Sequence, residues 1–243
     1  MFPNPLAGLQ QQYQQACALA QQAMMMEAAA NPAAAAQLYD QAIWLISSCI
    51  MQAQQSGIPT PDPVFFSLCF CNFNAARMKW ALGAAQFVPA HLAQALGAIN
   101  QAITLNPGFS SYHTAAGMVL MAQGSLAWAE QAFQRALQLN PMDVQAQWLL
   151  GSLYNMQGNA ATAQQYYAAV QRQAPNVQVP QFGPPQVAPG AVPSGTAGSG
   201  HTLDTVEKVL NIAKTGLDVL GGFQKLFGSG TGGFSAGGFN SGW

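Results

Sequence analysis

The sequence contains very little charge. Charged side chains make up 6% of the 243 residues, whereas about a quarter is usual in soluble domains. The formal net charge is −1, and seven Lys and Arg residues spread along the chain form no basic patch, which excludes a nucleic-acid partner. Gln, with about thirty copies, does most of the solubilising instead. Because charge repulsion between copies is then weak, a homo-oligomer is an open expectation.

Long apolar runs and targeting signals are also missing. No stretch reaches the ~20 uninterrupted apolar residues that a membrane-spanning helix needs. The opening residues, MFPNPLAGLQQQYQQ, contain neither a basic segment nor an apolar run of the signal-peptide type. The sequence therefore predicts a cytoplasmic protein without a membrane span.

Residues that could act in catalysis or bind a metal are few and scattered along the sequence. The three histidines lie in different regions, and no catalytic triad, nucleophile elbow or phosphate-binding loop is present. Four cysteines, mostly flanked by apolar residues, are interpreted as buried free thiols rather than as disulfides or metal ligands: Cys17, Cys49, Cys69 and Cys71. We therefore predict no enzyme, no catalytic residue, no metal site and no cofactor.

Regular breaks divide residues 5 to about 175 into helical segments. Good helix formers (Ala, Gln, Leu and Met) dominate this part of the chain. Breaks that contain Pro or Gly separate segments of ~13–24 residues, none of which alternates with the period of a strand. We expect an all-α arrangement of eight helices in antiparallel pairs, with a first hairpin over 5–56 and further hairpins over 62–177.

The composition changes after Asn176. Residues 178–200 are rich in Pro and then in Gly and Ser, which predicts a linker, and the Gly-rich tail over 229–243 is predicted to be disordered. Between them, residues 201–228 form a predicted amphipathic helix, in which three acids balance three lysines. Its apolar stripe, the candidate docking surface, consists of Leu203, Val206, Leu210, Ala213, Leu217 and Leu220.

A 34-residue period runs through the helical region. Three prolines at this spacing, Pro107, Pro141 and Pro175, close the units 76–109, 110–143 and 144–177. Within a unit, a small residue such as Gly117 is predicted to lie where the two helices touch most closely, against Ala129. A ring such as Phe133 is predicted to fill the gap toward the next hairpin. Because a lone hairpin cannot cover its own apolar face, the units should stack.

This pattern resembles the tetratricopeptide repeat family. The stretch LLGSLYNMQGNAATAQQYYAAVQRQAP has the residue classes of that family at its spacing, in Leu150, Gly151, Tyr154, Gly158, Ala163, Tyr167 and Pro175. The resemblance implies a right-handed superhelical solenoid of antiparallel hairpins, here with a tethered C-terminal helix. The unit 76–109 departs from the pattern near Lys79 and Phe87, so its frame stays open.

The first hairpin has two interpretations. Ala35, Tyr39 and Ala42 repeat the internal spacing of the unit 110–143, which favours a diverged repeat or cap. The same stretch is also similar to the first two helices of the MIT module, which recruits membrane-remodelling machinery.

In the tetratricopeptide repeat family, the inner helix of each hairpin lines a concave groove that holds an extended peptide or a helix. The resemblance implies twelve groove residues: Arg77, Trp80, Phe87, Ser111, Thr114, Met118, Met121, Gln145, Trp148, Ser152, Asn155 and Met156. Trp80 and Trp148 have a second interpretation as core residues, because an error of one residue in the frame would turn them inward. This lining favours an amphipathic helix as ligand. The residues with which some members clamp the carboxyl terminus of chaperones are missing, because Trp80, Ala84, Ala115, Gln145 and Leu149 occupy those positions.

The predicted function is a non-enzymatic interaction scaffold or adaptor that binds an apolar peptide or helix. One candidate ligand is the chain's own predicted amphipathic helix over 201–228, which could instead pair with copies of itself. The alternative is a membrane-associated adaptor that docks through this helix, although such helices are normally richer in basic residues, or an MIT-like recruitment module at the N-terminus.

Overall fold

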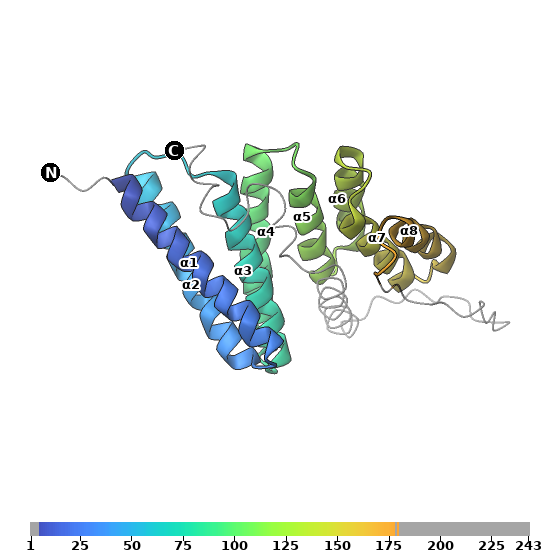
Figure 1. The fold of residues 1–243 in the computed structure, drawn as a ribbon, viewed down its shortest axis with the longest axis horizontal. Coiled ribbons are helices and arrows are strands. Elements are labelled where there is room, and N and C mark those ends of the chain that lie inside the picture. Colours follow the sequence, from blue (N-terminus) through green and yellow to red (C-terminus); the bar gives the residue numbers. More distant parts are fainter. Residues whose placement is uncertain (1–4, 178, 180–243) are drawn as a thin grey trace. The chain divides into compact units, whose positions relative to one another are not determined.

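The computed structural model describes residues 5–177 and residue 179 (Figure 1). Within these residues the chain forms eight α-helices, one short 3-10 helix and no strand, so the predicted all-α fold class is confirmed. No described helix is both long enough and apolar enough to cross a membrane. The predicted helix over 201–228, with most of the predicted linker and the whole predicted tail, lies outside the described residues.

The described chain falls into two compact units that divide between Tyr112 and His113. The N-terminal unit contains α1 (Pro5–Ala28), α2 (Pro32–Gln55), α3 (Asp62–Ala81), the 3-10 helix η1 (Ala85–Phe87) and α4 (Val88–Leu105). The C-terminal unit contains most of α5 (Ser110–Ala122), followed by α6 (Leu126–Leu139), α7 (Val144–Met156) and α8 (Ala160–Gln173).

Local sequence signals explain where the helices of the N-terminal unit begin and end. The side chain of Asn31 accepts a hydrogen bond from the amide of Ala34 at 3.1 Å, and Pro32 supplies the preformed first turn of α2. Gly57 and Gly83, which follow α2 and α3, have φ angles of 65° and 73°. Because a left-handed backbone favours glycine, these two positions allow the chain to turn back.

Small residues allow the helices of the first hairpin to approach closely. Helices α1 and α2 lie side by side, and α3 packs against α2 and α4 (Figure 1). The contact between α1 and α2 is rich in fully buried alanines, including Ala16, Ala20 and Ala35. Such a surface permits a short interhelical distance and leaves little room for other groups.

The four cysteines are buried in the N-terminal unit with free thiols, which confirms the interpretation made from the sequence. Burial disfavours the thiolate and raises the pKa of Cys17 to about 12 and that of Cys49 to about 11. These thiols are therefore protonated packing groups and not nucleophiles at neutral pH.

The helices of the C-terminal unit are short and regular. Helices α6, α7 and α8 have 14, 13 and 14 residues. The side chains of Asp143 and Asn159 cap α7 and α8 by accepting from backbone amides at 2.9 and 3.2 Å. Each hairpin turns at a glycine with positive φ, at Gly124 and at Gly158.

A ring packs onto a glycine in each hairpin of this unit. A Cβ atom added at Gly117 would lie 2.4 Å from a ring carbon of Phe133, and one at Gly151 would lie 2.7 Å from the ring of Tyr167. The sequence interpretation placed Ala129 opposite Gly117 and directed the ring toward the next hairpin. In the structure the ring lies against the glycine of its own hairpin, because only glycine leaves space for it there.

Candidate binding surface on the repeats

The residues predicted to line a groove in the C-terminal unit lie on α5 and α7, and side-chain contacts join these two helices. Gln145 on α7 donates a hydrogen bond from Nε2 to the Sδ atom of Met118 on α5, at 3.6 Å. Two predicted ligand-facing side chains from successive repeats are therefore neighbours. Neither α5 nor α7 contains Asp, Glu, Lys or Arg.

The predicted groove residues of the C-terminal unit differ in accessibility. Asn155 is exposed, and Gln145 and Met156 are half-buried. The other five, which are at most 3% exposed, are Thr114, Met118, Met121, Trp148 and Ser152. Among these eight residues, the accessible groups are thus two amides and one thioether, and the buried ones are three large apolar side chains and two hydroxyl side chains.

Two of the buried polar residues have a structural role. Thr114 donates from Oγ1 to Oδ2 of Asp143 at 3.0 Å, while Oδ1 of the same carboxylate caps α7. Ser152 donates to the carbonyl of Trp148 and lies 3.0 Å from the hydroxyl of Tyr167. These bonds connect α5 to α7 and α7 to α8, so both side chains fix the helices that carry the surface.

Trp148 is buried next to Tyr167, with ring centroids 6.4 Å apart. Its indole Nε1 donor has no hydrogen-bond partner in the part of the chain that the structure describes. An unpaired buried donor lowers stability, by about 1–3 kcal/mol in mutational studies. Sequence reasoning could not foresee it, because the partner of an indole depends on the packing around it.

The predicted groove residues of the N-terminal unit have different surroundings. Arg77 is buried in an ion pair with Glu27 at 3.3 Å and also bonds the side chain of Asn74. Trp80 and Ser111 are half-buried. Phe87 is 51% exposed, and the ammonium group of Lys79 lies 5.5 Å from its ring centroid. The ion pair between Arg77 on α3 and Glu27 on α1 thus joins these two helices.

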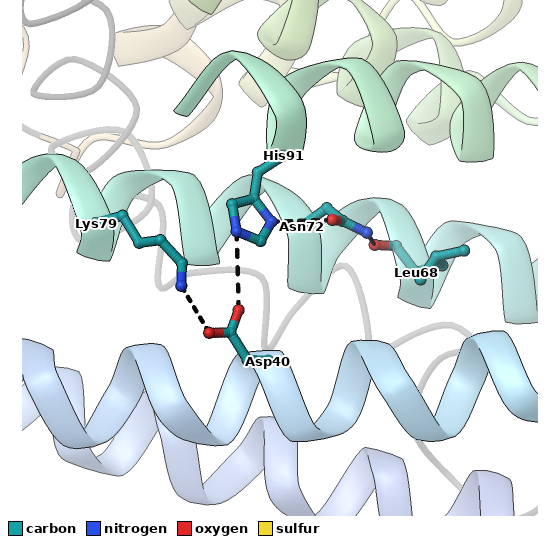
Figure 2. Close-up of polar contacts among 5 residues, drawn as sticks. All are labelled: Asp40, Leu68, Asn72, Lys79 and His91. Carbon is teal, nitrogen blue, oxygen red and sulfur yellow. Dashed lines mark hydrogen bonds and ion pairs between the residues drawn. The ribbon is translucent and has the colours of Figure 1, made fainter. Parts of the chain in front are cut away.

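Sequence reasoning missed a polar junction between α2, α3 and α4, which Figure 2 shows. Lys79 Nζ lies 2.6 Å from Asp40 Oδ2, and His91 Nε2 lies 3.8 Å from Asp40 Oδ1. The other ring nitrogen of His91, Nδ1, is 3.1 Å from Asn72 Oδ1. Burial lowers the pKa of His91 and the ammonium of Lys79 adds to this effect, whereas Asp40 raises it.

A second missed cluster lies in the C-terminal unit. Tyr154 on α7 donates to Oε1 of Glu130 on α6 at 2.6 Å and stacks on Tyr166 of α8, with centroids 5.6 Å apart. The hydrogen bond to Glu130, followed by burial, raises the pKa of Tyr154 to about 12. The family pattern places a tyrosine here, but nothing in the sequence identifies its carboxylate partner.

The six predicted docking-helix residues, from Leu203 to Leu220, lie outside the described residues, so the structure adds nothing to that prediction.

Comparison with known proteins gives one family. A model described as tetratricopeptide repeat matches residues 90–141 and, in an overlapping match, residues 114–177. No curated protein matches the chain significantly.

Several solved structures are similar to the chain at low identity. A thermophilic TPR protein of Thermus thermophilus, TTC0263, is 19% identical with a TM-score of 0.43, over 65% of this chain and 90% of that one. YrrB, a TPR protein with an unusual peptide-binding site, is 17% identical with a TM-score of 0.40, over 65% and 86%. MamA is 16% identical with a TM-score of 0.35, over 62% and 93%.

Proposed function

Because the chain belongs to the tetratricopeptide repeat family through residues 90–177, we propose that it is a non-enzymatic protein–protein interaction scaffold that binds a peptide or helix. The observation that carries the proposal is the pairing of α5 and α7 through Gln145 and Met118. Consecutive repeats that present their inner helices side by side offer a continuous surface to an elongated ligand.

The proposed ligand is apolar or amphipathic. Helices α5 and α7 contain no Asp, Glu, Lys or Arg, and Arg135 and Arg172, the exposed cations of the described C-terminal unit, lie on α6 and α8. A ligand held by charge would find no counter-charge on α5 or α7. Apolar burial with a few amide hydrogen bonds would therefore supply the affinity, which should depend only weakly on salt.

The chain supplies one candidate ligand itself, the predicted amphipathic helix over 201–228. A labelled peptide of this sequence is the probe, and the receptor is the chain ended after Gly200, which keeps every described residue. We expect saturable binding, measured by fluorescence anisotropy, that weakens by about tenfold or more when Gln145 and Asn155 are both changed to Lys, because binding would bury two unpaired charges.

The matched control places the same two charges on α8, at the exposed residues Gln164 and Gln171. It should leave binding unchanged. The proposal fails if the peptide does not bind, or if both double variants weaken binding equally.

The second candidate function is a membrane-associated adaptor, favoured by the one-sided apolar stripe of residues 203–220. Flotation of the full chain with anionic liposomes, compared with the chain ended after Gly200, tests it. An MIT-like role for the first hairpin would instead predict a partner that binds α1 and α2. Location in the cytoplasm stays a prediction from the sequence.

A further inference from the structure

The junction in Figure 2 joins the two hairpins of the N-terminal unit through ionisable groups. Asp40 belongs to α2 of the first hairpin, whereas Lys79 and His91 belong to α3 and α4 of the second. The three side chains are partly shielded from water, with exposed fractions of 42%, 19% and 15%. Protons from solvent can therefore reach this contact between the two hairpins.

Asn72 fixes the tautomer of His91. The amide nitrogen of Asn72 donates to the carbonyl of Leu68 at 3.0 Å, so its oxygen must face His91. That oxygen can only accept, and it lies 3.1 Å from Nδ1 of the imidazole. In the neutral ring the proton therefore resides on Nδ1, and Nε2 carries a lone pair.

The lone pair on Nε2 faces a carboxylate. Oδ1 of Asp40 is 3.8 Å from Nε2, while Oδ2 of the same group is held by Lys79 at 2.6 Å. Two acceptors that face each other cannot form a hydrogen bond. A proton on Nε2 would convert this contact into a charge-assisted donor–acceptor pair, in which His91 competes with Lys79 for Asp40.

We propose that Asp40, Asn72, Lys79 and His91 form a proton-sensitive junction, in which proton uptake by His91 draws Asp40 away from Lys79 and loosens the packing between the two hairpins. The junction carries one positive and one negative charge while His91 is neutral, and gains an uncompensated positive charge when His91 is protonated. Lys79 already lies over the ring of Phe87, which offers it a second partner when it loses Asp40. The inference does not depend on the proposed binding function.

The direction of the pH effect follows from the groups around His91. Burial and the charge of Lys79 outweigh Asp40, so the pKa of His91 in the folded chain lies below its ordinary value of 6.5. The folded chain then binds fewer protons than the unfolded chain just below pH 6.5. Stability is therefore lost as the pH falls through that window.

The first test measures the pKa of His91 directly. His113→Asn and His201→Asn leave one histidine in the full chain, whose ring signals are followed by NMR titration. We expect a pKa of His91 below 6.5 and, in the nitrogen spectrum, a proton on Nδ1 of the neutral ring. Two further variants should shift this pKa in opposite directions. Lys79→Met should raise the pKa because it removes a neighbouring cation, and Asp40→Asn should lower it because it removes the anion.

The matched control is Arg172→Met, which removes an exposed cation on α8 and should leave the pKa of His91 unchanged. A proton on Nε2, a pKa at or above 6.5, or shifts of the same sign in Lys79→Met and Asp40→Asn would overturn the proposal. Because Asp40→Asn keeps the size of the side chain, it remains informative if Lys79→Met does not fold.

A second readout concerns the packing of the hairpins. Hydrogen exchange of the α2 and α3 amides in the full chain should accelerate between pH 7 and pH 5, after correction for the intrinsic pH dependence of exchange. The acceleration should be lost in His91→Asn, whose side chain does not titrate in this range, and kept in His113→Asn. Equal acceleration in both variants would show that His91 does not control the junction.

Discussion

The two units hold a buried aromatic ring between the helices of a hairpin in different ways. In the C-terminal unit, helices of 13 or 14 residues place a ring against a glycine, as Phe133 does at Gly117. In the N-terminal unit, α1 and α2 have 24 residues each, and Tyr39, which occupies the same internal spacing as Phe133, donates to Glu27 at 2.6 Å. Close packing against Gly117 holds the ring of Phe133, and a hydrogen bond to Glu27 holds the ring of Tyr39.

The family match begins at residue 90, within α4, and therefore leaves out α1, α2 and α3 of the N-terminal unit. Ala35, Tyr39 and Ala42 are fully buried, as are Ala129, Phe133 and Ala136 at the corresponding spacing. The positions that make the hairpin contact are thus alike in both units, while helix length and polar connections are not. Hairpin stacking tolerates longer helices if the contact residues keep their places.

Phe133→Ala should have the largest effect on stability. The ring is fully buried against Gly117, so its loss leaves a cavity and should lower the free energy of unfolding by about 3–5 kcal/mol. Urea denaturation measures the change. Trp128→Ala on the same helix removes a ring that is 65% exposed and should cost much less; similar losses would show that the ring–glycine contact does not organise this unit.

Gly117→Ala should be next in size. A methyl group there would meet the ring of Phe133, and overpacking of this kind costs about 1–3 kcal/mol. The control is Gly97→Ala in α4, where an added Cβ has no neighbour within 4 Å and better helix propensity should stabilise by up to about 1 kcal/mol. Opposite signs in thermal denaturation are expected, and stabilisation by both changes would contradict the close contact.

Tyr39→Phe removes the hydrogen bond that holds the ring of Tyr39 in the first hairpin. The carboxylate of Glu27 keeps Arg77 but loses the hydroxyl donor, which should cost about 1–2 kcal/mol in urea denaturation. Tyr166→Phe on α8, where the ring is half-buried and stacked on Tyr154, is the matched change and should cost less. An equal loss in both would mean that the bond to Glu27 adds nothing.

The smallest effect is expected from Glu130→Gln, at the other tyrosine–carboxylate pair. The pKa of Tyr154 should fall from about 12 toward its ordinary value, because the neutral hydroxyl loses an ionised acceptor. Because the pKa of Tyr154 is raised in the folded chain, the interaction of its neutral hydroxyl with Glu130 stabilises the fold below pH 10. This stabilisation is lost as the pH rises toward 12. Absorbance of tyrosinate across that range measures it, and a titration unchanged in the variant would contradict the assignment.

Part of the fold and of the candidate surface could be predicted because the signals are local. The glycines at 124 and 158 mark turns within a hairpin, and the prolines at 107, 141 and 175 follow the last helix of one. The repeat pattern predicts that Met118 and Gln145 face a ligand; their side chains are in contact, but their role in binding stays a prediction. The burial of Trp148 could be predicted only as one of two interpretations and the internal ion pair of Arg77 not at all, because both depend on the neighbouring helices.

By itself the sequence determined that the chain is all-α, where its hairpins turn and which residues repeat, because capping, backbone φ and hydrophobic period act over a few neighbouring residues. Only the tertiary structure decided which ring each glycine receives and that Asp40 meets Lys79, 39 residues away, beside His91. Such contacts depend on the register of one helix against another, and no local pattern encodes that register.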